Sequence, residues 1–449
     1  MYKRLFNLTL IWYGFGPIIT SGIYWKMPPA VISIGNKVDE VLILFMLLFV
    51  IINFSKLQYR INNPLKILTL LFLSIIILSG IINQVHILII LEFILRYGKG
   101  LIIFMYTRSF INIDNKFLYL FFKRIQQFFI IQCSINLLWL LKIDIIPNKY
   151  IDYGLFQKGA FGTFDWAIGS MGNCLLVAFI STIILSKSFY HLAFEKMPKK
   201  SKRKQIILFI ISTIQIYLSF TNHLYFIVPV ILFLTWKLIS PIKIKFKPIL
   251  IVVFLSLIIF NSFDVSNRLN MISGFAKHGI DRVLVSPKFI SYHVSFATIP
   301  KLSTIGFFGA GPGQAGSYIA RENSTPLNKK YYEKFNIVKF RGASILTTPY
   351  TGITTIQSEL GNAGILLFMF LCTYIILKIR KKVVLDIKHK QLSIYTMTKF
   401  ITLFWLLLYI TENTLLDLLQ HTYLPVLTWI LISFSINKLD LTYFKAKII

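Results

Sequence analysis

Apolar segments about twenty residues long recur along the whole chain, with shorter polar connections between them. About twenty apolar residues is the length that an α-helix needs to cross the hydrocarbon core of a bilayer. The segments are solid apolar blocks, whereas a membrane β-barrel shows short segments of alternating polarity, so helices are expected. The pattern predicts twelve spans, at residues 6–24, 39–54, 65–83, 86–106, 124–142, 166–186, 205–220, 222–239, 248–262, 357–378, 397–414 and 421–437. We therefore predict an all-α, polytopic integral membrane protein.

The basic residues of the short connections give the predicted spans a direction. Lysine and arginine accumulate in the short cytoplasmic loops of membrane proteins. Here the connections at 83–86, 221–222 and 415–420 contain neither residue, so they are expected outside. The basic connections expected inside are those at 56–66, 108–124, 196–204, 237–247 and 378–382. This arrangement places both termini in the cytoplasm.

A large polar insert, residues 263–356, divides the predicted spans into two groups. About nine spans precede it, in residues 1–262, and three follow, in residues 357–449. The insert is expected outside, although it is basic, because loops longer than about sixty residues cross the membrane regardless of charge. Its basic character therefore needs another explanation. A second outer segment, at 143–165, is a candidate for the opposite wall of a site.

Composition and charge exclude a soluble protein and argue against nucleic-acid binding. Hydrophobic residues make up 56% of the chain and charged residues only 14%, which leaves too little polar surface to cover a soluble core. The formal net charge is +31, but the lysines cluster in the short connections, as the positive-inside rule requires. The three cysteines fall in predicted spans, which predicts buried free thiols.

Four arginines of the insert are the first candidates for chemistry. A guanidinium is always charged, and its planar set of donors suits phosphate oxygens. On an external loop near the membrane surface, such residues fit an anionic lipid head group such as a diphosphate. Solvated loop charge is the alternative for any single one of them. The four residues are Arg268, Arg282, Arg321 and Arg341.

The insert also contains a compact glycine turn, Gly309-Ala310-Gly311-Pro312-Gly313. Glycine permits positive φ and close backbone approach, and proline fixes the dihedral between them. This pattern predicts a rigid turn that can direct backbone N–H groups at an anion. The alternative is a turn with a purely structural role, at the point where the insert returns to the membrane.

Several ionisable residues near or inside predicted spans are further candidates. Glu359 opens the tenth predicted span at its outer edge, where it could act as a base or orient an arginine. An interfacial charge paired with loop lysines is the alternative. Glu92, Arg96 and Lys99 share one face of the fourth predicted span. Charges at this depth usually line cavities, which favours a cavity role for Arg96, although Glu92 could also simply neutralise it.

Nothing in the predicted outer segments indicates a metal site. His278 and His293 of the insert do not stand at a metal-binding spacing, and no HxxxH, CxxC or DxD pattern occurs there. Metal-dependent glycosyl transfer usually needs clustered carboxylates to hold a divalent ion. We therefore expect chemistry without a metal or other cofactor.

This arrangement resembles the bacterial O-antigen and capsular polysaccharide polymerases and the related O-antigen ligases. The shared pattern is ten to twelve spans with one large external loop in the C-terminal half. That loop runs from an arginine through a Gly-x-Gly-Pro-Gly turn to a Glu-x-Gly entry into the next helix. In this chain the elements are Asp281-Arg282, Gly309 to Gly313, and Glu359-Leu360-Gly361 followed by Gly364. The topology matches along the whole chain, and the motifs match within 282–364.

The resemblance implies a metal-independent, membrane-embedded (GT-C-like) glycosyltransferase of the bacterial cytoplasmic membrane. Its substrates would be glycans carried on undecaprenyl diphosphate at the outer leaflet. A terminal sugar hydroxyl of one unit attacks the anomeric carbon of another chain, and the lipid diphosphate leaves. Fixed arginines can stabilise the charge on the leaving diphosphate. The implied partners are these lipid-linked glycans, the bilayer, and the chain-length regulator and flippase of the same pathway.

Within this resemblance, Arg282 is the main candidate for stabilising the leaving group, and Glu359 and His293 are the candidates for the base. Tyr350 stands where the ligase branch has a histidine, which favours the polymerase branch. The candidate substrate-binding residues are Arg96, Arg268, Arg321, Arg341, Gly309, Gly311, Gly313 and Tyr350. An O-antigen ligase, or a flippase for lipid-linked oligosaccharides, remains the alternative.

Overall fold

The computed structural model describes most of the chain, in twelve stretches. They are residues 2–10, 29–53, 63–140, 172–218, 224–239, 287–302, 306–332, 337–340, 343–346, 351–414, 419 and 424–436. The predicted spans at 6–24 and 248–262, and much of the first part of the insert, lie partly or wholly outside these stretches.

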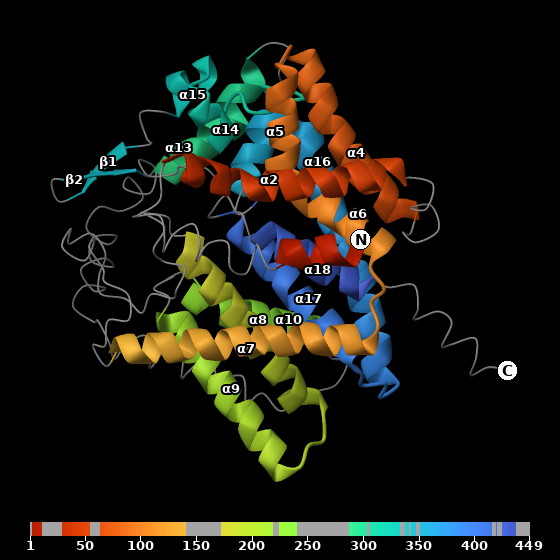
Figure 1. Cartoon of the computed structure of the whole chain (residues 1–449). Coiled ribbons are helices and arrows are strands. Elements are labelled where there is room, and N and C mark those ends of the chain that lie inside the picture. The colour runs from red at the N-terminus through yellow and green to blue at the C-terminus, as the bar shows by residue number, and fades with distance from the viewer. Residues whose placement is uncertain are drawn as a thin grey trace.

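The described residues form a helical protein, as predicted, with one small exception (Figure 1). Residues 2–10 are helical. The longer helices are α2 (Pro29–Ile52), α4 (Asn63–Ile82), α5 (Ile87–Tyr97), α6 (Lys99–Phe110), α7 (Asn115–Leu140), α8 (Gly172–Phe194), α9 (Lys199–Leu218), α10 (Leu224–Ile239), α16 (Gly352–Lys388), α17 (Ile394–Glu412) and α18 (Leu424–Ser435). The insert contributes α13 (Pro287–His293), η3 (Val294–Thr298), η4 (Ile299–Lys301), α14 (Tyr318–Glu322) and α15 (Pro326–Tyr331). The exception is an antiparallel ribbon of β1 (Ile337–Phe340) and β2 (Ala343–Leu346), also in the insert.

Three of these helices are long and apolar enough to cross a membrane, namely α4, α16 and α17. Four shorter apolar helical segments accompany them within the described part of the chain, at Glu40–Ile52, Ala178–Phe194, Ile227–Ile239 and Leu424–Ser435. Helices of soluble proteins normally have a polar face toward water, whereas these segments are apolar on all sides. They therefore make the chain a candidate multi-pass membrane protein.

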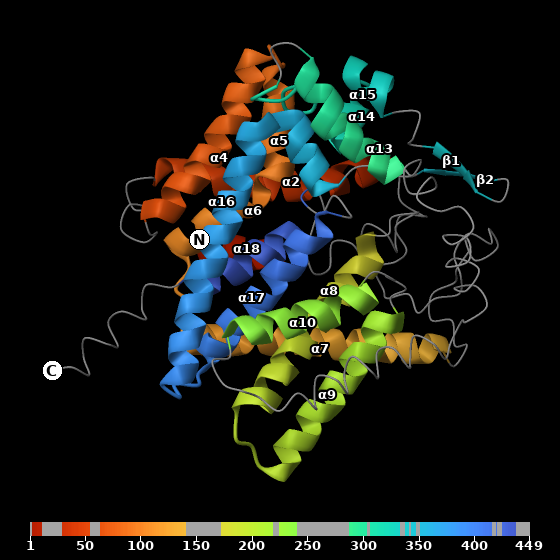
Figure 2. The same cartoon turned by 180° about the vertical axis from the view of Figure 1, so that it is seen from behind.

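Two of the predicted spans differ from the helices that the structure contains. The predicted span at 86–106 is divided at Gly98 into α5 and α6, so Arg96 and Lys99 belong to different helices. Most of the predicted span at 124–142 belongs to α7, which carries Lys123, Arg124 and three glutamines and is not among the candidate spans. Figures 1 and 2 show α7 and α2 running across the direction of α16. If α16 stands upright in a bilayer, α7 lies nearly flat.

The core of the bundle forms where α16, α17, α18, α6 and α4 pack together. Trp405 of α17 is fully buried, and its Nε1 donates to Thr428 Oγ1 of α18 at 2.8 Å. Ser435 and Thr402 join the same two helices by a hydroxyl hydrogen bond of 2.6 Å. Hydroxyl groups that bond to a neighbouring helix or to their own preceding turn let helices approach closely in an apolar environment.

The insert packs against one end of this bundle. The backbone N–H of Ile353 donates to the carbonyl of Asn413 at 3.2 Å, which joins the start of α16 to the end of α17. Tyr292 of α13 donates its hydroxyl hydrogen to the carbonyl of Thr414 at 2.6 Å. Burial raises the pKa of Tyr292, and a hydrogen bond with Thr351 acts in the opposite direction. In Figure 1, α13, α14 and α15 gather at the upper end of the molecule, beside α5 and the start of α16.

The opposite end of the bundle brings together two of the most basic connections. The α8–α9 connection (Glu195–Pro198) and the start of α17 line the same cavity. Arg380, near the end of α16, donates from Nε to the carbonyl of Leu238 in α10 at 3.0 Å. The α8–α9 connection and the end of α16, two of the connections that were predicted to face the cytoplasm, therefore lie away from the insert (Figure 1).

Candidate functional site at the junction of insert and bundle

The centre of the junction is a break in α16 at Gly361. This residue has φ 64° and ψ −160°, so the helix stops after Leu360 and begins again at Asn362. A break leaves carbonyl and N–H groups of the neighbouring turns without helical partners. In a membrane protein such groups must be satisfied by other parts of the protein.

The glycine turn of the insert supplies those partners. The N–H of Ala310 donates to the carbonyl of Ser358 at 2.8 Å, and the N–H of Gly311 donates to the carbonyl of Glu359 at 3.0 Å. In the opposite direction, the N–H of Ala363 donates to the carbonyl of Phe307 at 3.0 Å. The turn is therefore joined to the break by three backbone hydrogen bonds, and two motifs that are far apart in the sequence form one structure.

Glycine is required on both sides of this contact. Gly309 and Gly361 both have positive φ, at 71° and 64°. A Cβ atom on Gly309 would lie 2.5 Å from the N atom of Gly361, and a Cβ atom on Gly361 would collide with the backbone of Gly309 and Phe307. Because the obstacles are backbone atoms, no side-chain rotation can make room.

The turn also surrounds the carboxylate of Glu359. This side chain is completely buried, and its two oxygens accept hydrogen bonds from the N–H of Gln314 at 2.8 Å and of Ala315 at 3.0 Å. The sequence interpretation was that the turn directs backbone N–H groups at an anion. In the structure, the N–H groups that directly follow the turn donate instead to the carboxyl group of the protein's own Glu359.

Two polar residues at the C-terminal end of α4 support the same structure. The hydroxyl of Ser79 lies 2.6 Å from the carbonyl oxygen of Phe308 and 3.0 Å from that of Glu359. Asn83 donates from Nδ2 to the carbonyl of Gly309 at 3.2 Å. Neither residue was selected from the sequence, although two polar side chains at i and i+4 near the end of an apolar helix were a visible signal.

Arg96 lies at the edge of the junction, where three glutamates surround it. Its guanidinium forms ion pairs with Glu40 of α2 at 3.1 Å, Glu92 of α5 at 2.8 Å and Glu322 of α14 at 2.7 Å. The Arg96 side chain is 17% exposed. The sequence interpretation that Glu92 neutralises Arg96 matches this geometry, and Glu322 extends the pairing to the insert. A substrate phosphate at Arg96 would have to displace carboxylates that already occupy its donors.

Arg321, which also lies close to the ring of Tyr318, is in a different situation. The guanidinium carbons of Arg321 and Arg96 lie 5.5 Å and 5.9 Å from the centre of the Tyr318 ring. Nη1 of Arg321 is buried and has no hydrogen-bond partner among the described residues. A guanidinium that retains unused donors is better suited than a fully paired one to binding an additional anion.

The other predicted site residues fall into two groups. His293 is exposed at the end of α13, and the described hydrogen bonds and ion pairs do not join it to Glu359 or to Arg96. Gly311 and Gly313 have positive φ and are buried against Val85 and Ile89 respectively. Four residues lie outside the described stretches, namely Arg268, Arg282, Arg341 and Tyr350.

Chemically, the junction is a preorganised scaffold with charged residues at its margin. Within the described ranges, no group of three or more His, Cys, Asp or Glu side chains is arranged to hold a metal ion. The buried carboxylate of Glu359 positions backbone, whereas Arg321 presents donors. The long apolar helices and this junction define a helical protein with candidate membrane spans and a structured polar insert. No protein-family model matches the chain, and no curated protein matches it.

Proposed function

We propose that this protein is a glycosyltransferase that polymerises glycan units carried on undecaprenyl diphosphate, at the outer face of the bacterial cytoplasmic membrane. The bond that forms joins a terminal sugar hydroxyl oxygen to the anomeric carbon of another lipid-linked chain. The bond that breaks joins that carbon to the diphosphate, which leaves with the lipid, and the hydroxyl proton passes to a base. The proposal includes twelve spans, with both termini in the cytoplasm.

The observation that carries the proposal is the seating of the glycine turn on the break in α16. The Gly-x-Gly-Pro-Gly turn and the Glu-x-Gly helix entry are two of the three motifs on which the resemblance to O-antigen and capsule polymerases depends, and the third, Asp281-Arg282, lies outside the described stretches. Gln314, next to the turn, and Glu359 are 45 positions apart, yet the two segments are joined directly. Two motifs that merely occurred by chance in a polar loop would have no reason to be joined in this way.

The gathering of the predicted outer connections supports the proposed orientation. Asn83 of the α4–α5 connection contacts the glycine turn, and Thr414 after α17 contacts α13. Both connections lack lysine and arginine, whereas the basic α8–α9 connection lies at the other end. This distribution follows the positive-inside rule when the insert faces outside.

In the proposed mechanism, arginine side chains of the insert stabilise the leaving diphosphate. Arg321 is the described candidate because its Nη1 has no partner within the described part of the chain. Arg282 keeps the role that the resemblance implies. Glu359 acts as a positioning residue, because it is buried and both oxygens accept backbone N–H groups. His293, which is exposed, is the candidate base.

The class of the protein is tested by deleting the gene and measuring the length of the surface glycans. A polymerase predicts that glycans fall to a single repeat unit. Long polymer that is not attached to its acceptor would instead identify a ligase, and complete absence of surface glycan would identify a flippase. Either of these results would overturn the proposal.

The residue assignment is tested by complementing the deletion with single variants. Arg282→Ala and Arg321→Ala are expected to leave the protein in the membrane while the glycan shortens. Arg203→Ala, which changes an exposed arginine in the basic α8–α9 region, is the control and should restore full-length glycan. Long chains in both insert variants would contradict the role of these arginines without deciding the class of the protein.

A further inference from the structure

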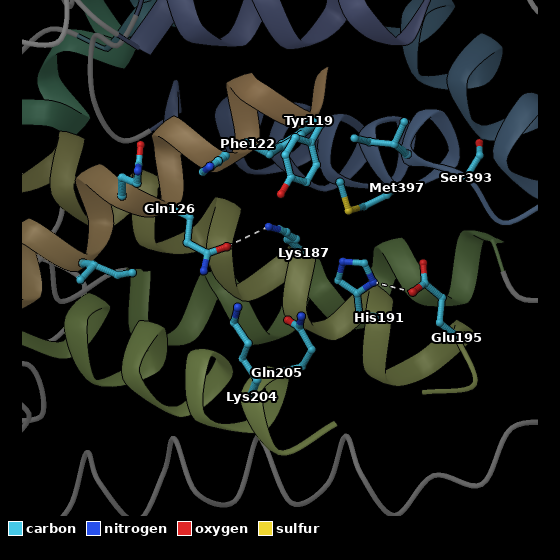
Figure 3. A pocket seen from close by; sticks show the side chains of 14 residues that line it. Tyr119, Phe122, Gln126, Lys187, His191, Glu195, Lys204, Gln205, Ser393 and Met397 are labelled. Carbon is cyan, nitrogen blue, oxygen red and sulfur yellow. Dashed lines mark hydrogen bonds and ion pairs between the residues drawn. The ribbon is translucent and has the colours of Figure 1, made fainter. Parts of the chain in front are cut away.

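A cavity of about 480 Å³ lies at the end of the bundle opposite the insert (Figure 3). It is enclosed by α7, α8, α9 and the start of α17. Neither the glycine turn nor any residue of the junction takes part in it. The cavity therefore has no role in the proposed glycosyl transfer.

Positive charge converges in this cavity from three different helices. Lys123 of α7, Lys187 of α8 and Lys204 of α9 all contribute to its lining. In Figure 3 the amines of Lys187 and Lys204 both point toward the part of the cavity beside Gln126. Lys187 donates to Gln126 Oε1 at 3.0 Å, which is a neutral partner.

No carboxylate of the lining balances these lysines. Glu195 is the acidic residue that faces the cavity, and its Oε2 lies 2.7 Å from Nδ1 of His191. The ion pairs among the described residues give none of the three lysines an acidic partner. Like charges that are held together in a partly buried space repel one another, so this arrangement costs free energy in the absence of a ligand.

The rest of the lining combines neutral hydrogen-bonding groups with an apolar wall. Tyr119 and Gln205 face the cavity, and Gln205 Oε1 is buried with no partner among the described residues. Phe122, Ile130 and Met397 form the apolar part. A ligand that fits this lining carries several acceptor oxygens and negative charge and tolerates apolar contact on one side.

We infer that this cavity binds a phosphate group, carried either by the head group of an anionic phospholipid or by a soluble phosphate compound. A phosphate presents several acceptor oxygens at once, and lysine binds it as a flexible point charge. The basic run that begins at Lys196 adjoins the cavity. Such runs near a membrane surface attract the anionic lipids of the cytoplasmic leaflet.

The inference is tested on the purified full-length protein in a neutral detergent with two probes. One probe is the short-chain lipid dioctanoyl-phosphatidylglycerol, and the other is inorganic phosphate. Binding is measured by calorimetry for the parent protein and for Lys187→Gln and Lys204→Gln. The control is Lys202→Gln, which removes one exposed charge from the same helix at a position that does not line the cavity.

We expect saturable binding of at least one probe, weakened about tenfold by each cavity substitution and changed less than about twofold by Lys202→Gln. Binding of the lipid but not of phosphate assigns the site to a phospholipid, and the converse assigns it to a soluble compound. Binding of neither probe, or equal weakening by Lys202→Gln and Lys204→Gln, would overturn the inference. Lys204 is exposed, so its variant tests the cavity even if Lys187→Gln does not fold.

Discussion

The two ends of the molecule differ in whether their charged side chains have partners within the protein. At the junction with the insert, the carboxylate of Glu359 is bound by backbone N–H groups, and Arg96 is paired with three glutamates. At the opposite end, Lys123, Lys187 and Lys204 face a cavity without an acidic partner among the described residues. Charge that is satisfied internally maintains a structure, whereas charge that is left unbalanced around a cavity indicates a ligand.

This difference shows why a charged residue in a motif is not necessarily a residue that contacts substrate. Glu359 has the position expected of a base, but a fully buried carboxylate with two N–H donors is suited to holding the glycine turn in place. Arg321, by contrast, keeps a buried nitrogen without a described partner. The free energy of unfolding and glycan length separate these two kinds of role.

The largest effect is expected from adding a methyl group at the break in α16. Gly361→Ala places a Cβ atom against the backbone of Gly309 and Phe307 at a φ of 64°. Backbone strain and overpacking together should lower the free energy of unfolding by about 4 kcal/mol. The measurement is thermal unfolding of the purified protein in detergent, followed by tryptophan fluorescence.

The control for that substitution replaces a residue of the insert that has positive φ by glycine. Ser324 is exposed and has φ 48°, so Ser324→Gly should cause no loss of stability. If Gly361→Ala unfolds at the parent temperature, the contact between the turn and the break does not hold the insert in place.

A smaller loss is expected when the internal anion is removed. Glu359→Ala leaves the N–H groups of Gln314 and Ala315 buried without their acceptors, which should cost about 3 kcal/mol. Glu359→Gln keeps one acceptor oxygen and should cost about half as much. The same unfolding assay compares the two variants. Equal stability of Glu359→Ala and the parent would exclude the positioning role.

Arg96 and Arg321 provide a matched pair, because both guanidinium groups lie close to the ring of Tyr318. Arg96→Met leaves three glutamates near one another and should lower the free energy of unfolding by about 2 kcal/mol, less than for a fully buried pair because the site is partly exposed. Arg321→Met should cost less than about 1 kcal/mol, since it loses only a contact with an aromatic ring.

The two variants should differ in the opposite order when glycan length is measured instead of the free energy of unfolding. Arg321→Met is expected to shorten the glycan in a stable protein. Shortening by Arg96→Met alone, with Arg321→Met producing full-length glycan, would move the substrate-binding role to Arg96.

The smallest effect is expected at the basic cavity, where a substitution should raise the free energy of unfolding rather than lower it. Lys204→Gln removes a charge that repels Lys187, so the protein without ligand should lose no stability and gain about 0.3 kcal/mol. The unfolding temperature is measured in phosphate-free buffer with fully delipidated protein. A clear loss of stability would show that Lys204 has an internal partner, and the two ends of the molecule would then be alike.

Much of the secondary structure could be predicted from the chain because apolar length is a local property. The pattern of residues 357–378 and 397–414 predicted the helices α16 and α17, and 65–83 predicted α4. The division of the span at 86–106 was not predicted, because the apolar stretches before Arg96 and after Gly100 together have the length of one membrane span. The position of α7 was also not visible, because its direction depends on packing against other helices rather than on its own sequence.

The candidate site shows the same division. The glycine turn and Glu359 were identified from composition and spacing, but their mutual contact was not. Ser79 and Asn83, which hold the turn from α4, and Glu40 and Glu322, which pair with Arg96, were missed. These residues come from three different parts of the chain, and only their meeting gives them a role.

The sequence by itself determined that the chain is helical, with candidate membrane spans and a polar insert between them, because hydrophobic length is a local property that is read along the chain. Only the tertiary structure decided which charged side chains have hydrogen-bond or ion-pair partners within the protein and which do not. That distinction depends on distances between side chains and backbone groups that are remote in sequence, and a buried charge changes its role according to the donors around it. Folding made Glu359 an internal anion of the insert and brought Lys123, Lys187 and Lys204 together around one cavity.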